Sequence, residues 1–317
     1  MEELRREDAV WFKEVVERAL NAISSIIVGK RKELEMIIAT LLAEGHVLLE
    51  GVPGVAKTLI ARCVAQVFDL EFRRIQVTPD MLPTDIIGFK MYDPEKVEFV
   101  LRKGPIFANI VLVDEINRAP PKTQAALLEA MQERQVTIEG ETLKLPRPFM
   151  VIATMNPVEV EGTFPLSEAQ IDRFLSKVRI GYPTIDETVE ILKRYDRIVE
   201  GGLKPVISRE ELVRAMNLVK KVRVDENILR YIALIVEETR KHPSVRLGAS
   251  PRGAIALYLL SRAIALMRGR AYVTPDDVKY VAHVALEHRI VLKTEARISG
   301  IDASTIIDEV LDKVEPP

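Results

Sequence analysis

The stretch GVPGVAKT, Gly51 to Thr58, constrains the fold of this chain more than any other feature. It directly follows the apolar run 46–50, and a helical pattern over 58–68 comes after it. A strand before and a helix after are the context of a phosphate-binding loop of the pattern Gly-x-x-x-x-Gly-Lys-Thr, although Ala56 replaces the second glycine. The stretch therefore predicts an α/β fold in which backbone N–H groups and a helix N-terminus face phosphate groups.

Side chains of this loop have specific expected contacts. Lys57 would reach the β- and γ-phosphates of a nucleotide, and the Thr58 hydroxyl would help to hold Mg²⁺. Ala56 is compatible with such a loop if its φ angle is negative, because no glycine is then needed. The alternative is a plain glycine turn with a surface lysine. The candidate nucleotide-binding residues of the loop are Gly51, Pro53, Gly54, Val55, Ala56, Lys57, Thr58 and Leu59.

Short apolar runs, most of them separated by helical patterns, predict a parallel sheet covered on both faces, an αβα sandwich. These runs lie at 46–50, 71–76, 110–115, 149–156 and 177–182. Two segments interrupt the alternation. Residues 89–104 and 135–145 each read as a β-hairpin inserted into the α/β core. Insertions of this size are either surface decoration or functional elements.

Polar residues end two of the predicted strands. Asp114 and Glu115 lie at the C-terminal tip of one, and Asn156 ends the next. Ligands of open α/β sheets bind at that edge. Asp114 would hold Mg²⁺, Glu115 would polarise an attacking water, and Asn156 would orient it. The alternative for the two acids is a solvated turn at the end of the strand. The alternative for Asn156 is a turn-forming residue before Pro157.

The strand pattern stops at Pro183, and the remaining sequence is helical. We expect a helix over Ile185–Ile198 and further helices that begin at a capping residue or a proline. These begin at Ser208, near Asp225, at Ser250–Pro251 and at Thr274, the last of them being the last long helix. The pattern predicts an α/β domain over 1–183 and an all-helical lid domain over 184–317.

Two arginines occupy positions where a bound anion would be favourable. Arg173 follows the fourth strand-like run, and Arg252 lies in the first turn of the helix that Ser250 caps. A cation at a helix N-terminus is mildly unfavourable, and a triphosphate nearby would offset this cost. The alternatives are an ion pair of Arg173 with Asp172 and a solvated surface arginine at 252.

Composition excludes several classes of protein. The net charge of −2 over 317 residues gives no bulk attraction to nucleic acid or to anionic membranes. The single cysteine, Cys63, excludes an internal disulfide and fits a reducing compartment. The N-terminus is charged and lacks the order of a signal peptide, and the apolar window 253–267 is interrupted by Arg262. We therefore expect a cytoplasmic protein that does not enter a membrane.

Taken together, these motifs resemble the AAA+ ATPases and, among them, closely the MoxR family. The resemblance extends over nearly the whole chain. The segments that carry it are GVPGVAKT, RIQVTPDMLPTDIIG at 74–88, GPIFANIVLVDEINRAPPKTQAALLEAMQE at 104–133, ATMNP at 153–157, LSEAQIDRF at 166–174 and GASPRG at 248–253. An alanine before the loop lysine is typical of this family.

The resemblance implies a role for each candidate residue in binding and hydrolysing ATP. Lys57 and Thr58 match Walker A, and Asp114 and Glu115 match Walker B. Asn156 matches sensor 1, and Arg252 matches sensor 2. Arg173 matches an arginine finger acting on the neighbouring subunit, and Val28 and Gly29 match the lining of the adenine pocket. The two hairpins match insertions that face the central pore in related rings.

The resemblance also implies partners. A finger supplied in trans means that hydrolysis depends on assembly, and we expect a homo-oligomer, a hexameric ring. MoxR-like ATPases are expected to act on other protein complexes in a chaperone-like way, often with a von Willebrand factor A domain protein. This chain has no such domain, so that partner would be a separate protein.

Two other functions compete with this hypothesis. A nucleic-acid motor would use the hairpins to grip phosphates, but their charge is mixed, and a phosphate grip should be predominantly basic. The basic residues are Lys90, Lys96, Arg102, Lys103, Arg134 and Lys144, and the acidic ones Asp93, Glu95, Glu98, Glu139 and Glu141. A nucleotide-gated scaffold would bind ATP without turnover, which the presence of Glu115 disfavours.

Overall fold

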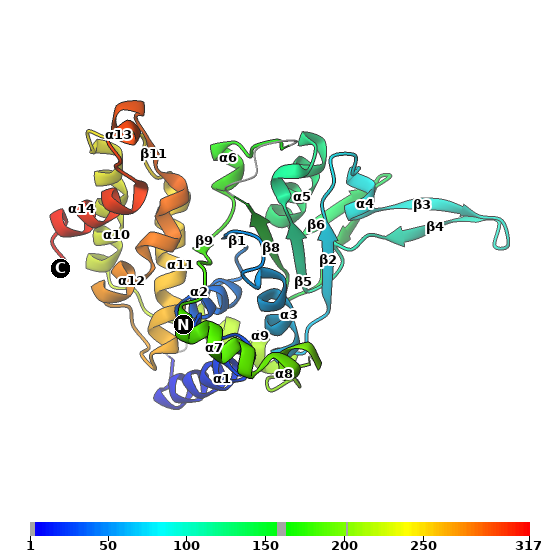
Figure 1. The fold of residues 1–317 in the computed structure, drawn as a ribbon, viewed down its shortest axis with the longest axis horizontal. Helices are drawn as coiled ribbons and strands as arrows, with labels where there is room; N and C mark the ends of the chain where they lie inside the picture. The colour runs from blue at the N-terminus through cyan, green and yellow to red at the C-terminus, as the bar shows by residue number, and fades with distance from the viewer. Residues whose placement is uncertain (1–3, 157–162, 201) are drawn as a thin grey trace.

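The computed structural model describes residues 4–156, 163–200 and 202–317 (Figure 1). Its centre is a parallel sheet of five strands in the order β2-β5-β8-β1-β9. The strands are β1 (Val47–Glu50), β2 (Phe72–Gln76), β5 (Ile110–Asp114), β8 (Met150–Met155) and β9 (Ser176–Arg179). All five predicted apolar runs are strands of this one sheet, so the predicted α/β fold with a parallel sheet is confirmed.

Helices cover both faces of the sheet, because side chains alternate between the faces along each strand. Ile110 and Leu112 of β5 join the core formed with α1, α2 and α3, whereas Val111 and Val113 join the core formed with α5. The covering helices are α1 (Arg6–Ser24), α2 (Arg31–Leu42), α3 (Lys57–Val67), α4 (Pro83–Ile87) and α5 (Pro121–Glu133). This is the predicted αβα sandwich.

The register of the strands brings their carboxyl ends to one edge. Gln76 of β2 lies beside Asp114 of β5, and Glu50 of β1 lies beside Met155 of β8. The loop after β1, the acids after β5 and the amide after β8 therefore meet at this edge, as expected for a parallel sheet.

Both predicted hairpins are present. The first, β3 (Gly88–Asp93) and β4 (Glu98–Lys103), projects from the body of the molecule (Figure 1). The second pairs β6 (Gln135–Ile138) with β7 (Glu141–Lys144). An ion pair of 2.9 Å between Lys90 Nζ and Glu141 Oε2 joins the two hairpins, so the base of the projecting hairpin is tied to the second one.

The chain after Pro183 is mostly helical, and helices begin at all four predicted starts, three of them with a side-chain cap. Ser208 accepts a hydrogen bond from the backbone of Glu211, whose carboxylate accepts one from Ser208 N–H. Asp225 and Ser250 likewise cap their helices. The helices are α9 (Arg209–Val219), α10 (Glu226–Lys241), α11 (Pro251–Met267) and α12 (Pro275–Leu286). The division into domains at residue 183 stays a prediction.

The helical region differs from the prediction in three places. The expected helix over Ile185–Ile198 is two helices, because Arg194 leaves helical geometry (φ −103°, ψ 4°) where its guanidinium donates to Ser24 O at 3.3 Å. A two-stranded antiparallel ribbon interrupts the helices, and two helices follow α12. The two helices that replace the expected one are α7 (Ile185–Lys193) and α8 (Tyr195–Glu200), and the elements added in this region are β10 (Val245–Leu247), η2 (Glu287–Arg289), β11 (Val291–Leu292), α13 (Thr294–Ile298) and α14 (Ala303–Lys313). The short η1 (Ile116–Arg118) and α6 (Glu168–Ile171) lie before Pro183. Strands of two and three residues are too short to give a sequence pattern.

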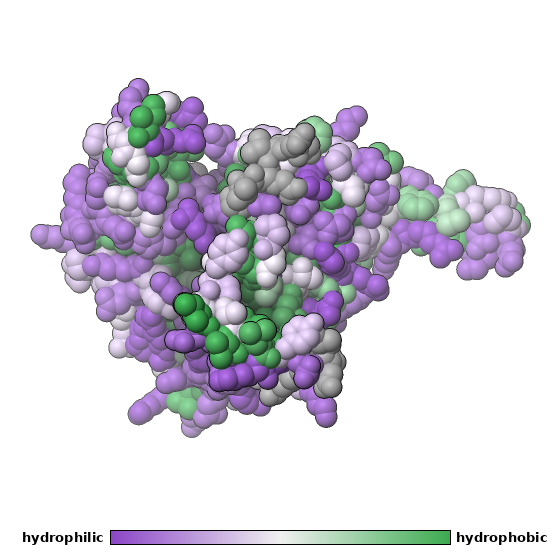
Figure 2. Space-filling model, viewed as in Figure 1, coloured by the Kyte–Doolittle hydropathy of each residue, from purple (hydrophilic) through white to green (hydrophobic). Residues whose placement is uncertain are grey.

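One helix leaves an apolar face open to solvent. Ile185, Val189 and Leu192, at helical spacing on α7, are 85%, 44% and 68% exposed. Figure 2 shows apolar surface gathered over this helix. Exposed apolar patches of this kind mark interaction sites more often than isolated apolar residues do. Within the described ranges, no helix combines the length and apolar character needed to cross a bilayer.

A buried histidine predicts acid-sensitive stability. His46 directly precedes β1 and bridges β8 and α5. Its Nδ1 accepts from Val151 N–H, and its Nε2 donates to Met131 O, both at 2.9 Å. Burial lowers the pKa of His46 to about 4, below the unfolded value of about 6.5. Its contribution is therefore complete above pH 6.5 and is lost as the pH falls toward 4, because the unfolded state takes up the proton first.

We expect this loss to reach on the order of 3 kcal/mol at pH 4. The measurement is urea unfolding between pH 4 and 7 for the wild type and for His46→Gln, whose amide can donate and accept. The wild type should lose stability more steeply than the variant over this window. Parallel curves would show that His46 is not the group responsible.

Candidate functional site

The loop that joins β1 to α3 has left-handed backbone at two positions. Gly54 has φ 84°, which glycine adopts without cost. Ala56 has φ 65° and ψ 21°, so the expectation of an ordinary negative φ at this position is wrong. A left-handed alanine costs roughly 1–2 kcal/mol. The loop therefore has the backbone conformation that a second glycine would take, and holds it with an alanine.

Lys57 is folded against its own loop. Its Nζ donates to Gly51 O and, at 3.3 Å, to Val52 O. Burial lowers the pKa of Lys57, and the carboxylates of Asp114 and Glu115 oppose this shift. The ammonium group is thus held at the loop, near two acids, where a polyphosphate would replace its carbonyl partners.

Asp114, at the end of β5, is the hub of the site. Thr154 Oγ1 donates to its Oδ1 at 3.0 Å, and Thr58 Oγ1 donates to its Oδ2 at 3.4 Å. Arg74 Nε, from β2, lies 2.8 Å from the same Oδ2. The carboxylate is buried and oriented by three side chains that come from separate elements.

Glu115 has a strained backbone. Its φ of 60° and ψ of 54° are left-handed, and its N–H donates to Thr154 Oγ1 at 2.9 Å. Its carboxylate lies 2.9 Å from Arg118 Nε. Strain of roughly 1–3 kcal/mol at a non-glycine residue is typical of functional sites. The turn directs Glu115 into the cavity beside the loop rather than back along the strand.

A cavity of about 350 Å³ collects most of the predicted site residues. Lys57, Thr58, Asp114, Glu115 and Asn156 all line it, together with other residues of the loop and of neighbouring strands. The further lining residues are Pro53, Gly54, Ala56, Leu59, Arg74, Gln76 and Thr154. Gly51 and Val55 do not line it, and Val55 is buried in the core.

The residues present fit a magnesium ion. Mg²⁺ takes oxygen ligands and is usually bound through one or two carboxylates together with substrate phosphates. Thr58 Oγ1 and Asp114 Oδ2 lie 3.4 Å apart beside the loop, so a hydroxyl and a carboxylate converge where phosphates would bind. No cluster of three His, Cys, Asp or Glu side chains suited to a metal occurs in the described part of the chain.

Val28 and Gly29 precede α2 and do not line this cavity, and Gly29 lies against Glu187 in the first turn of α7. Gly29 has φ 72°, and a Cβ at this position would come within 1.9 Å of Glu187 Oε1. Glu187 also pairs with Lys30 at 3.6 Å. A side chain at this position would displace the Glu187 carboxylate, and the left-handed backbone of Gly29 favours glycine. The expected adenine-pocket role of Val28 and Gly29 stays a prediction.

Arg173 and Arg252 also lie outside the cavity, and near each other. Arg173 donates to Leu128 O at 3.2 Å and lines a separate cavity of about 340 Å³ that includes Gln132. Arg252 Nη2 lies 3.5 Å from Gln132 Oε1 and its Nη1 lies 4.0 Å from Asp172 Oδ2. The structure thus groups the two arginines by α5, apart from the loop.

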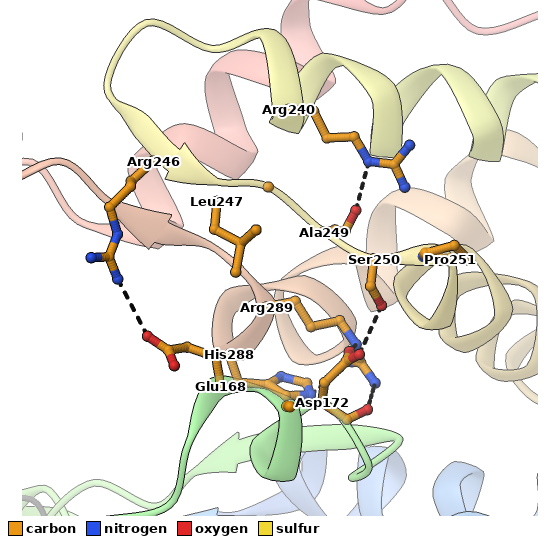
Figure 3. A pocket seen from close by; sticks show the side chains of 12 residues that line it. Glu168, Asp172, Arg240, Arg246, Leu247, Ala249, Ser250, Pro251, His288 and Arg289 are labelled. Atoms are coloured by element: carbon orange, nitrogen blue, oxygen red, sulfur yellow. Dashed lines mark hydrogen bonds and ion pairs between the residues drawn. The ribbon is translucent and has the colours of Figure 1, made fainter.

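A buried arginine, Arg289, and the cap residue Ser250 both bind Asp172, the residue directly before Arg173 (Figure 3). Arg289 of η2 is 2% exposed, and its Nε donates to Asp172 Oδ1 at 2.8 Å. Its Nη2 also donates to Phe174 O at 2.6 Å. Ser250 Oγ, the cap of the helix that carries Arg252, donates to Asp172 Oδ2 at 2.8 Å. The turn of Arg173 and the helix of Arg252 are therefore fixed together.

Three polar residues of the cavity are absent from the sequence-based prediction. Gln76 ends β2, Arg74 lies two positions before it, and Thr154 lies within β8, one strand position before the end. A signal was available for Gln76, because it is the last residue of the predicted parallel strand 71–76 and so shares the edge used by Asp114 and Glu115. Only the strand order, which places β2 beside β5, makes them neighbours.

Comparisons with known proteins agree with this architecture. Residues 46–176 match the ATPase family associated with various cellular activities (AAA), and residues 237–310 match the AAA lid domain. A solved structure of a candidate ATPase from Cytophaga hutchinsonii superposes with a TM-score of 0.92 and 39% identity, over 98% of this chain and 97% of that one.

Named relatives span nearly the whole chain. The uncharacterized protein YeaC of Bacillus subtilis is 49% identical over 95% of this chain and 94% of its own length. The chaperone MoxR1 of Mycobacterium tuberculosis is 44% identical over 95% of this chain and 82% of its own. Protein MoxR of Methylorubrum extorquens is 29% identical over 92% and 93% of the two chains.

Proposed function

Because this chain belongs to the MoxR family of AAA+ ATPases, we propose that it hydrolyses Mg·ATP to remodel, mature or activate a protein complex. The observation that carries the proposal is the cavity in which the loop lysine, the hub carboxylate Asp114 and the strained Glu115 converge. A relative named as a chaperone supports the chaperone-like part of the proposal.

The chemistry follows from the residues around the cavity. Lys57 and the backbone N–H groups of the loop bind the phosphates. Thr58 and Asp114 hold Mg²⁺, which when bound neutralises charge on the phosphate oxygens. Glu115 accepts a proton from the attacking water, and Asn156 orients that water by hydrogen bonding. Arg118 and Arg74, which pair with Glu115 and Asp114, exchange these partners when the nucleotide binds.

Arg173 and Arg252 act on the site of a neighbouring subunit. Neither lines the cavity of its own chain, and both are grouped beside Gln132. Cations near a transferring phosphate stabilise the charge that develops there. A homo-oligomer, in our proposal a hexameric ring, brings these cations to the next cavity. The apolar face of α7 supports assembly, because exposed apolar surface is typical of interaction sites.

The projecting hairpin is the proposed contact with the client. Its exposed side chains include five large apolar ones, Phe89, Met91, Tyr92, Val97 and Phe99, among charged ones. Tyr92 and Phe99 form an edge-to-face pair with ring centroids 5.6 Å apart. Lys90, a cation of this hairpin, is already paired with Glu141. This surface suits an apolar segment of a protein better than a phosphate backbone, so a nucleic-acid motor is not favoured. A separate von Willebrand factor A domain protein is the proposed adaptor.

A trap experiment tests the client. In a Glu115→Gln background, which should hold ATP without hydrolysing it, tagged protein is used to capture partners from a lysate of its source organism. We expect a protein complex or a von Willebrand factor A domain protein to be recovered. Adding Tyr92→Ser and Phe99→Ser should reduce recovery at least about tenfold, since a lost aromatic contact costs roughly 1–3 kcal/mol.

The matched control is Val10→Ser, which removes an apolar side chain that is 49% exposed on α1, far along the chain from the hairpin. It should leave recovery unchanged. Equal recovery by the hairpin variant would remove the hairpin from client binding. Recovery of DNA or RNA in place of protein would favour the motor.

A further inference from the structure

A second cavity, of about 750 Å³, lies in the helical region where the loop between α9 and α10 meets α11. It shares no lining residue with the cavity at the phosphate loop. Four basic side chains line it, Lys220, Lys221, Arg223 and Arg262, and none of its described lining residues is acidic. Its volume falls in the range of about 300–1,000 Å³ that is typical of small-ligand sites.

Arg262 is the unusual member of this group. It is only 7% exposed, and its Nη1 donates to Tyr258 Oη at 3.0 Å. Its Nε is buried without a hydrogen-bond partner. In the described structure Tyr258, and no carboxylate, offsets the burial of its charge. The guanidinium carbon lies 5.0 Å from the centre of the Tyr258 ring. Burying an arginine without an anion is costly, because its charge loses hydration.

Other arginines of the same region are compensated. Arg289, equally buried, pairs with Asp172 at 2.8 Å. Arg268, which lies directly after α11, pairs with Asp277 at 2.9 Å and stacks over a tyrosine ring at 4.4 Å. Arg262, in the described structure, has the hydrogen bond and the ring contact with Tyr258 but no carboxylate. The missing anion is therefore a property of this position and not of arginines in this fold.

The walls of the cavity are fixed. Arg223 N–H donates to Ala271 O at 2.9 Å, and Val273 N–H donates to Arg223 O at 3.1 Å. These bonds hold the α9–α10 loop against the segment after α11. Tyr272 and Leu229, both about half exposed, line the cavity together with Tyr258 and supply apolar surface near the cations.

We propose that this cavity binds a small organic anion, a carboxylate or phosphate carried on an apolar group, which Arg262 pairs with directly. The anionic head would meet Arg262, with Arg223 at the wall, and the apolar part would pack on Tyr258, Tyr272 and Leu229. Desolvation lowers the pKa of Arg262. An arginine begins from so high a pKa that its guanidinium stays charged at neutral pH. The inference does not depend on the proposed function.

The test uses octyl phosphate and octanoate as probes, below their micellar concentrations, with octanol as the neutral match. Calorimetric titration and thermal unfolding of the full chain measure binding. We expect both anions to bind and to raise the melting temperature, and octanol to do neither. Binding of octyl phosphate but not octanoate would identify a site for phosphates. Binding of octanoate but not octyl phosphate would identify a site for carboxylates. Equal binding of octanol, or no binding of either anion at millimolar concentration, would overturn the proposal.

Arg262→Met should weaken binding of the anions by roughly 30-fold or more, the loss typical of a broken buried charge pair. Without ligand, this variant should unfold at the same or a higher temperature than the wild type, because a desolvated charge is gone. Arg262→Lys keeps the charge and should retain measurable binding. Arg268→Met, the control with a similar ring contact, should bind as the wild type does. Unchanged binding by a folded Arg262→Met protein, together with a lower melting temperature, would make Arg262 a structural residue only.

Discussion

Replacing Arg173 with alanine is expected to lower ATP turnover by roughly 10³–10⁵-fold while ATP binding and folding persist. The residue lies outside the cavity of its own chain, where it donates to Leu128 O. Its charge is therefore proposed to act on the next subunit, where it stabilises the developing charge on the transferring phosphate. Steady-state phosphate release, at a protein concentration that assembles the oligomer, measures the effect.

Mixing two inactive variants shows whether the site is shared. Glu115→Gln supplies an intact Arg173, and Arg173→Ala supplies an intact Glu115, so mixed oligomers contain some complete sites. Turnover should reappear at intermediate mixing ratios. Arg246→Ala removes a different exposed arginine, one that pairs with Glu168 beside the same turn, and should stay active by itself. Failure of every mixture, with both variants folded, bound to ATP and associated, would refute a shared site.

Replacing Glu115 with glutamine is expected to lower turnover by roughly 10²–10⁴-fold, because an amide cannot accept the proton of the attacking water. Binding of ATP should stay near that of the wild type, since the phosphates are held by Lys57 and the loop. Single-turnover hydrolysis and equilibrium titration with a fluorescent ATP analogue separate the two quantities. The strained backbone of Glu115 is retained, because glutamine has the same length and branching.

Glu71→Gln is the matched control for this change, since Glu71 is exposed and pairs with Arg73 outside the cavity. It should leave turnover unchanged. A Glu115→Gln protein with the same turnover as the wild type would exclude Glu115 as the base. If both proteins also hydrolyse ATP no faster than the uncatalysed reaction, the result would favour a nucleotide-gated scaffold. Loss of ATP binding in Glu115→Gln would instead mean that Glu115 supports the loop.

The sequence alone was sufficient for the sheet and for most of the cavity. The five apolar runs, the loop pattern and the polar strand ends are local features, each a few residues long. Parallel pairing then obliges the residues after β1, β5 and β8 to meet at one edge. Lys57, Asp114 and Glu115 could therefore be grouped without knowing a single long-range contact. The caps at Ser208 and Ser250 were predictable for the same reason.

The tertiary structure decided whatever depends on contacts between distant segments. The left-handed angle of Ala56 follows from the path of the loop between β1 and α3, whereas alanine itself prefers a negative φ. Arg74 meets Asp114 only because β2 lies beside β5. Arg289 meets Asp172 across more than a hundred residues, and Arg262 is left without an anion by the packing around α11. Local propensities act over a few residues, but ion pairs, burial and strain are fixed only when the whole chain is packed.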